Sequence, residues 1–272
     1  TLRRAIPDDR SDGGRRRAVA RGVDLLSDGP GEHPPRDDAP TYGSYLELDE
    51  LLSLQRPRST PEHPDELLFI IVHQSSELWF KAILHDLDGL VDALDAREAG
   101  QALWRMQRVN TLMRIVAAQL TSLESLPPQH FAQFRGYLGT SSGAQSKQFR
   151  AMENRAETIE EHFLALLEAA HVHLDELYLG PGPTILFFLA EALLEYEQLF
   201  AQWRFTHVQV VERVIGPATD GSGGTLGSRY LKSTIDQRYF PKLWEVRGKF
   251  FGSTAPESTP PRARSAPHAG TP

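Results

Sequence analysis

Cysteine is absent from this chain of 272 residues. Its absence excludes disulfides, iron–sulfur clusters, thiolate ligation of haem and cysteine nucleophiles. Long hydrophobic runs are scarce too. We expect no stretch long enough to span a bilayer, and the arginine-rich first residues lack the continuous apolar segment of a secretory signal. These absences predict a cytoplasmic protein without a membrane segment.

The chain also lacks a strong excess of either charge. Its net charge is −7 and its isoelectric point is near 5.8, and basic residues are mixed with acidic ones along the sequence. A nucleic-acid groove or a surface for anionic lipids needs clustered positive charge. The composition therefore predicts no nucleic-acid or membrane partner and a small molecule as the ligand. A hydrophobic fraction of 40% is sufficient for a core.

Prolines divide the chain, because a proline inside a helix removes a backbone donor and clashes with the preceding turn. Residues 1–40 mix eight arginines with eight acidic residues and contain few large apolar side chains. Residues from Thr254 onward contain five prolines in nineteen positions. Such segments bury too little surface to offset the entropy lost on ordering. We expect disordered tails at residues 1–40 and 253–272 and a single domain at residues 41–252.

Helical periodicity, and not strand alternation, runs through the predicted domain. No proline occurs from Asp65 to Leu126, which leaves room for two long helices. The second of them has an apolar stripe at three- and four-residue spacing, formed by Val109, Leu112, Met113, Val116, Leu120 and Leu123. Further helices are predicted at residues 129–138, 145–177 and 183–215. The predicted fold class is therefore an all-α helical bundle.

Two histidines lie within strongly apolar helical segments. His73 follows Phe69-Ile70-Ile71-Val72, and His207 follows Trp203-Arg204-Phe205-Thr206. Either one alone is more simply interpreted as a hydrogen-bonded core histidine. A histidine that projects into an apolar cavity of a bundle is also suited to be the axial ligand of haem iron, and the aromatic and aliphatic residues around His207 would form a wall for a flat cofactor.

Further motifs accompany these histidines in a definite order. They are Tyr42-Gly43-Ser44-Tyr45-Leu46-Glu47-Leu48, the segment from Phe69 to Trp79, the segment from Phe134 to Arg150 with its Ser-Ser-Gly-Ala-Gln-Ser centre, the segment from Trp203 to Gly216, the loop at Gly221–Gly224, and Phe240-Pro241-Lys242-Leu243-Trp244. With this combination, from about Thr41 to Phe251, the chain resembles the tryptophan 2,3-dioxygenase family of haem-dependent oxygenases. Residues 41–252 would then be one haem-binding oxygenase domain.

The resemblance implies roles for individual residues. His207 would be the proximal ligand of the iron of haem b, with Trp203 beside the cofactor, and His73 would lie next to the indole nitrogen of the substrate. Arg135 would hold the substrate carboxylate, since a guanidinium forms a bidentate, charge-assisted pair with it. The other implied substrate contacts are Phe69, Phe131, Ser222, Tyr42, Tyr45 and Leu46, of which the last three reach the pocket from a neighbouring subunit.

The family resemblance also implies a reaction. Both atoms of O2 would be inserted into the indole of tryptophan, which breaks the C2–C3 bond and gives N-formylkynurenine. His73 is then expected to orient the indole N–H by hydrogen bonding and not to act as an obligatory base, because that N–H is very weakly acidic. The resemblance further implies a homotetramer in which neighbouring subunits complete each site.

Departures from the family pattern leave a second chemistry open. Phe131 stands where the family typically has tyrosine, Ser222 stands in place of a threonine, and the segment between Arg150 and the fourth long helix is shorter. The alternative is a secondary-metabolism enzyme that inserts one oxygen atom into a modified tryptophan, such as β-methyltryptophan, and gives an oxindole. A non-haem metal bundle is more remote, because Glu168-x-x-His171 is the only spacing of its kind. A non-catalytic helical scaffold is equally remote.

Overall fold

The computed structural model describes residues 39–217, 219 and 228–253. The predicted tails lie almost wholly outside the described residues, and Ser222 and the loop at residues 221–224 lie wholly outside them. The described chain forms two units, one ending at Leu51 and the other beginning at Leu52, and each is described here by itself. The tails and the boundaries of a single domain at residues 41–252 stay predictions.

The first unit contains the short helix α1 (Tyr42–Tyr45) and all but the last residue of α2 (Leu48–Leu52). A capping box begins α1: the Thr41 hydroxyl accepts the Ser44 amide at 3.2 Å, and the Ser44 hydroxyl accepts the Thr41 amide at 2.9 Å. The side chains that follow this cap are open to solvent, since Tyr42 is 77% exposed and Tyr45 is 74% exposed. The unit thus presents two tyrosines that its own chain does not bury.

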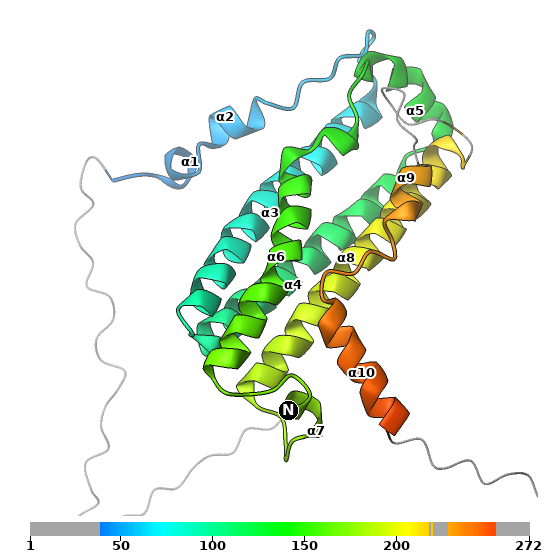
Figure 1. Ribbon diagram of the computed structural model, residues 1–272. Coiled ribbons are helices and arrows are strands. Elements are labelled where there is room, and N and C mark those ends of the chain that lie inside the picture. The colour runs from blue at the N-terminus through cyan, green and yellow to red at the C-terminus, as the bar shows by residue number, and fades with distance from the viewer. Residues whose placement is uncertain (1–38, 218, 220–227, 254–272) are drawn as a thin grey trace, which may run out of the picture. The chain divides into compact units, whose positions relative to one another are not determined.

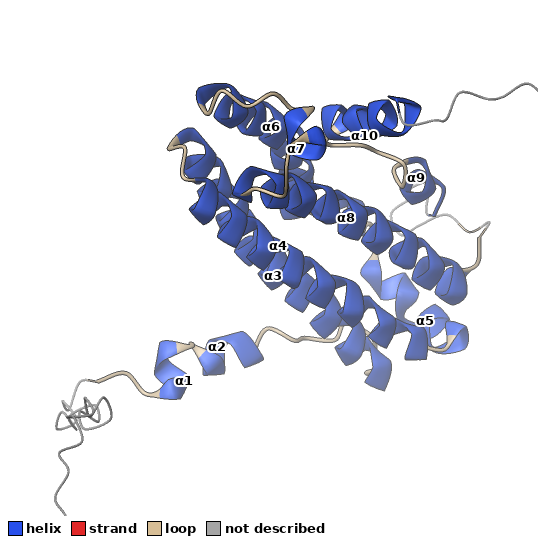
Figure 2. Cartoon of the chain, turned by 90° about the horizontal axis from the view of Figure 1, so that it is seen from below, coloured by secondary structure: helices blue, strands red, loops and turns tan. Residues whose placement is uncertain are grey.

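Four long helices build the second unit: α3 (Pro64–Asp95), α4 (Ala99–Leu120), α6 (Lys147–Ala169) and α8 (Ile185–Ile215). Helix α4 packs against both α3 and α8, and α6 packs against α3 (Figure 1, Figure 2). The remaining elements are short: η1 (Thr121–Ser125), α5 (Pro128–Phe134), η2 (Arg135–Leu138), η3 (Gly143–Gln145), α7 (Glu176–Leu179), α9 (Ser228–Ser233) and α10 (Pro241–Ser253). The described residues contain no strand, which confirms the all-α prediction.

The main core lies where the long helices face one another. The stripe predicted in α4 is buried at Val109, Met113, Val116 and Leu120, and Leu112 packs at its edge. The largest buried contributions from α3 and α8 come from Ile83, Leu87, Leu90, Leu193, Tyr196 and Phe200. Each large apolar side chain buried in this way stabilises the fold by about 1.5–3 kcal/mol. This core therefore fixes how the four helices pack.

Buried carboxylates fasten the C-terminal segment to the bundle. Glu197 of α8 accepts the Phe240 amide at 3.0 Å and the Trp244 indole N–H at 2.6 Å. Glu160 of α6 accepts the Lys242 amide at 2.9 Å, at the start of α10. A buried carboxylate is tolerated where several donors replace its hydration. The position of α10 on the bundle is thus set by hydrogen bonds as well as by apolar packing.

The third long helix is shorter than predicted. The sequence predicted a helix at residues 145–177, but α6 ends at Ala169. His171 has a φ of +55°, and its amide donates to the Glu168 carbonyl oxygen at 3.0 Å, as in a helix C-cap with a left-handed residue. Glu168 and His171 therefore do not lie one turn apart on a continuous helix, which removes the spacing on which the remote metal alternative depended.

Helix α3 corrects one expectation drawn from the sequence. It contains 18 consecutive residues apolar enough to cross a membrane by length and composition, where none was expected. A core helix of a soluble protein passes the same test, so one such helix says little about a membrane. The stretch is apolar on more than its core face, because Leu67, Ile71 and Leu78 are about half exposed.

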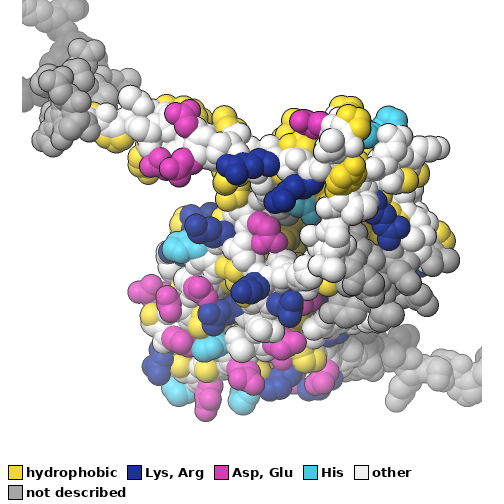
Figure 3. All heavy atoms as spheres, turned by 90° about the horizontal axis from the view of Figure 1, so that it is seen from above, with side chains coloured by type: hydrophobic (Ala, Val, Ile, Leu, Met, Phe, Trp, Pro, Cys, Tyr) yellow, Lys and Arg dark blue, Asp and Glu magenta, His cyan; other side chains and the backbone are white. Residues whose placement is uncertain are grey.

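Charges on the end of the bundle near α5 are mixed in sign. Figure 3 looks onto this end and shows acidic, basic and apolar side chains interspersed on the visible face. Mixed charge of this kind does not form the continuous positive surface that attracts a polyanion. The described part of this face therefore offers small, chemically varied patches.

Candidate active site

The two histidines singled out in the sequence lie on different long helices and face a common region. His73 belongs to α3 and His207 to α8. Burial, and to a smaller extent the charge of a protonated His73, lowers the pKa of His207 from its usual value of 6.5 to about 4. The two imidazoles are therefore close enough to interact electrostatically.

His207 lies in apolar surroundings that leave its Nδ1 without a hydrogen-bond partner among the described residues. Its ring centroid is 5.0 Å from that of Trp203, one helical turn earlier. Among the described residues, the buried atoms Nδ1 of His207 and Nε1 of Trp203 have no hydrogen-bond partner. Because the pKa of His207 is so low, the imidazole is neutral at physiological pH and keeps a free lone pair.

His73 is oriented by its own helix. Its Nδ1 lies 2.7 Å from the Phe69 carbonyl oxygen, one turn earlier. A carbonyl oxygen only accepts, so Nδ1 carries the proton. The surrounding protein lowers the pKa of His73 by desolvation, although part of its surface is accessible in this chain. The neutral ring therefore presents Nε2 as a hydrogen-bond acceptor.

A small apolar cluster joins the two histidine-bearing helices. Val72 of α3, Val210 of α8 and Leu123 of η1 are buried against one another, and Phe69 and Val214 pack at their edge. This cluster is separate from the main core and holds far fewer side chains. The region around His73 and His207 is thus walled by apolar groups that do not belong to the main core.

Aromatic contacts connect this region to α5. The Phe69 ring lies 4.2 Å from the His73 ring and 5.6 Å from the Phe131 ring, measured between centroids. Phe134 lies 5.7 Å from Phe69 and 5.3 Å from Phe131. Arg135 follows directly as the first residue of η2 and is half-buried. The structure therefore brings the helix that leads into Arg135 against the His73 helix.

The predicted site residues fall into two groups. His73, His207, Trp203, Phe69 and Phe131 meet in the region described above, and Arg135 adjoins it. Tyr42, Tyr45 and Leu46 belong to the first unit, where all three are exposed, and Ser222 lies outside the described residues. The predicted roles of both groups in binding the haem and the substrate stay predictions.

Sequence reasoning missed Phe134 and Val72, whereas Val210 is one of the aliphatic residues that it expected beside His207. Phe134 is fully buried and contacts both Phe69 and Phe131. The available signal was its position three residues after Phe131 and directly before Arg135, which places both phenylalanines on one face of a short helix. Val72 gave no such signal, because only the packing of α3 against α8 makes it a neighbour of Val210.

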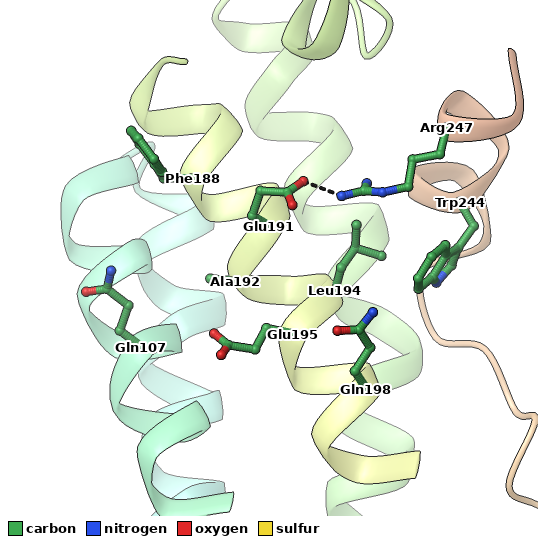
Figure 4. A pocket seen from close by; sticks show the side chains of 9 residues that line it. All are labelled: Gln107, Phe188, Glu191, Ala192, Leu194, Glu195, Gln198, Trp244 and Arg247. Carbon is green, nitrogen blue, oxygen red and sulfur yellow. Dashed lines mark hydrogen bonds and ion pairs between the residues drawn. The ribbon is translucent and has the colours of Figure 1, made fainter. Parts of the chain in front are cut away.

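A hollow lies away from these residues, between α4, α8 and α10, and has a volume of about 410 Å³ (Figure 4). Its two carboxylates are already paired: Glu191 forms an ion pair with Arg247 at 2.5 Å, and Glu195 accepts a hydrogen bond from Asn110 at 3.0 Å. None of the predicted site residues lines it. The hollow therefore does not compete with the histidine region as the active site.

The residues of the histidine region fit a haem group. Haem needs one neutral imidazole as an axial ligand and apolar walls for the porphyrin faces. His207 offers the first, since its pKa is held near 4 and its buried Nδ1 lacks a partner among the described residues. Trp203, Val72 and Val210 offer apolar surface beside it. The donor set is one imidazole with no thiolate, which matches a chain without cysteine.

The fold and site thus define an all-α bundle with an imidazole pair in an apolar region beside an aromatic–arginine segment. The sequence profile described as tryptophan 2,3-dioxygenase matches residues 31–165 and 178–250. The chain belongs to the tryptophan 2,3-dioxygenase family. The match is interrupted at residues 166–177, between the end of α6 and α8, within the segment where the sequence indicated a departure in length.

Proteins with this name are similar to the chain over most of its length. The tryptophan 2,3-dioxygenase of Herpetosiphon aurantiacus is 39% identical over an alignment of 257 residues. The match covers 76% of this chain and 97% of that protein. That of Anaeromyxobacter dehalogenans is 38% identical, covering 76% of this chain and 95% of its own. That of Bacillus cereus is 33% identical over 270 residues, covering 80% and 96%.

Proposed function

We propose that this chain is a haem-dependent dioxygenase that cleaves the C2–C3 bond of the indole of L-tryptophan and gives N-formylkynurenine. One observation carries the proposal: His73 and His207 come from different helices and face one apolar region, and desolvation lowers the pKa of each below its usual value. Membership of the family and the names of the relatives support the substrate and the reaction.

The proposed cofactor is haem b, with His207 as the axial ligand of its iron. When bound, the haem supplies the activation of O2. The contribution of the chain is a ligand nitrogen that need not lose a proton first, because burial keeps the pKa of His207 near 4. Trp203 packs beside this ligand and limits the orientations of its ring.

Substrate orientation is assigned to three groups. Nε2 of His73 accepts the indole N–H, since Nδ1 is committed to the Phe69 carbonyl oxygen. Arg135 pairs with the substrate carboxylate through a bidentate, charge-assisted contact. The rings of Phe69 and Phe131 pack against the indole and exclude water. Holding the indole in this way replaces much of the entropy cost of bringing the reactants together.

We also propose that the enzyme is a homotetramer in the cytoplasm, as the family resemblance implies. Tyr42, Tyr45 and Leu46 support a role for neighbouring subunits, because they are exposed in the single chain although two of them are large aromatic residues. Such residues are enriched at protein interfaces. In the tetramer they would complete the substrate pocket of the next subunit.

Turnover under labelled oxygen tests the reaction. The haem-loaded enzyme is incubated with L-tryptophan or β-methyltryptophan under ¹⁸O2, and the masses of the products are measured by mass spectrometry. We expect N-formylkynurenine with two labelled oxygen atoms from L-tryptophan. An oxindole with one labelled atom would instead establish mono-oxygenation, and the absence of any oxygenated product from either substrate would overturn the proposal.

The same assay with Arg135→Ala tests the carboxylate contact. Loss of a charge-assisted pair costs roughly 100-fold in kcat/KM for L-tryptophan. Binding of 3-methylindole, which has no carboxylate, should change by less than about threefold. Arg114→Ala is the control, because Arg114 pairs with Glu195 away from the histidine region. Equal losses for both ligands would contradict the assignment of Arg135.

A further inference from the structure

Three potential metal ligands meet where the start of α3 contacts α5. They are His63 and Asp65 of the α3 start and His130 of α5, and one ligand atom of each lies within 4.8 Å of the other two. The His63 and His130 rings are 5.2 Å apart between centroids, and His130 Nδ1 is 2.7 Å from Asp65 Oδ2. Residues about 65 positions apart in the sequence thus form one cluster.

We propose that His63, Asp65 and His130 bind a divalent transition-metal ion of the zinc class. Two imidazoles and one carboxylate are a ligand set typical of Zn²⁺, which takes nitrogen and oxygen ligands at about 2.0–2.2 Å. Ligand atoms around such an ion are about 3.3 Å apart, so rotation of the side chains by roughly 1 Å closes the cluster around it. Solvent can supply the remaining ligand, because the His130 side chain is 46% exposed.

The cluster differs from the ordinary histidine–carboxylate pairs of this surface. His162 Nδ1 lies 2.6 Å from Asp95 Oδ1 and joins α6 to α3 in the same way that His130 joins α5 to α3. That pair has no third ligand, since among the described residues only His63, Asp65 and His130 come together as a set of three. The pair of His162 and Asp95 is therefore a matched internal control.

The present hydrogen bonds indicate how the ion is accommodated. His63 is the N-cap of α3, and its Nδ1 accepts the Asp65 amide at 3.2 Å. Ligation through Nδ1 replaces this capping bond, whereas ligation through Nε2 moves the proton to Nδ1 and also ends it. One long capping bond is weak beside a metal–imidazole bond, so the exchange favours the bound ion.

An ion in this cluster would connect α3 to α5 beside the candidate active site. His63 packs against Phe134 with centroids 5.4 Å apart, and Phe134 contacts Phe69 and Phe131. The metal would thus hold in place the short helix that leads into Arg135. The proposal does not depend on the haem reaction, and metal binding is measured without turnover.

Equilibrium dialysis of the untagged, haem-loaded chain against ZnCl2 tests the site. Bound zinc is counted by elemental analysis, with quantitative amino-acid analysis as the measure of protein. We expect one zinc ion per chain to be bound with a micromolar or lower Kd. His63→Asn keeps an acceptor oxygen at the N-cap, and His130→Asn keeps a donor toward Asp65, so both variants preserve the local hydrogen bonds.

Each of these two variants should weaken zinc binding at least about 10-fold, as should Asp65→Asn. The control variant His162→Asn should bind zinc like the unmodified chain. The proposal is overturned if no zinc binds at 100-fold excess over protein, if the three cluster variants retain the original affinity, or if His162→Asn loses affinity to the same extent.

Discussion

The two halves of α3, residues 64–79 and 80–95, are both rich in apolar side chains, but they bury them to different extents. In the second half, Ile83, Leu87 and Leu90 are completely buried in the main core. In the first half, Val72 is buried, whereas Leu67 and Ile71 are 42% and 44% exposed. Hydrophobicity alone therefore does not distinguish the half that stabilises the bundle from the half that carries His73.

The difference shows which part of α3 is covered by its own chain and which part is not. The second half packs in the main core with residues of α4, α6 and α8. Apart from Trp79 at its end, the first half contributes to the small clusters around Val72 and Phe134, although it carries one of the two neutral histidines. Apolar surface that its own chain leaves exposed there is suited to cover a cofactor, a substrate or another subunit. This half is thus organised for binding and the other for stability.

Replacement of His207 of α8, which shares the histidine region with the first half of α3, should have the largest effect on binding and little effect on folding. In His207→Ala, haem content should fall below about one tenth of that of the unmodified protein, and turnover of L-tryptophan should drop by roughly three orders of magnitude or more, because the only proposed axial ligand is lost. Helical content should not change. Soret absorbance and far-UV circular dichroism measure the two effects, and His85→Ala, which removes an exposed imidazole from α3, is the control. Full haem loading of His207→Ala would refute the ligand assignment.

The division between the two halves was only partly predictable from the sequence. Proline spacing and the stripe in α4 predicted the long helices, because periodicity is a local property. The end of α6 was predicted wrongly, since it depends on the left-handed conformation of His171. The two histidines could be selected, but their shared region depends on how α3 and α8 pack. The cluster of His63, Asp65 and His130 joins distant segments, and no local pattern reveals it.

Truncation of one leucine in each half should sharpen the comparison. Leu87→Ala creates a cavity in the main core and should lower the free energy of unfolding by about 2–5 kcal/mol. Leu67→Ala truncates a leucine that is 42% exposed and should change the free energy of unfolding by less than about 1 kcal/mol. Urea denaturation of the two variants measures both values. Similar losses would mean that the first half contributes to the core as much as the second.

The smallest expected effect is a pH dependence that arises in the histidine region, to which the first half of α3 contributes His73 and α8 contributes His207. In the folded apoprotein the pKa of His207 is about 4, below its usual value of 6.5, so between these pH values the unfolded chain binds a proton that the folded chain does not. Stability from this group is therefore intact above pH 6.5 and falls as the pH is lowered toward 4, by about 1.4 kcal/mol at pH 5.5.

The substitution His207→Phe removes the titrating imidazole and fills similar space with an apolar ring. Between pH 7.5 and 5.5, the apoprotein should therefore lose about 1.4 kcal/mol more unfolding free energy than the variant does, as measured by urea denaturation at each pH. Other titrating groups are common to both proteins and cancel in the difference. Leu87→Ala has no titrating group, so its destabilisation should be the same at both pH values. If the unmodified protein and His207→Phe lose equal stability, His207 is not held neutral by its surroundings, and the lone pair assigned to the haem iron is not free at low pH.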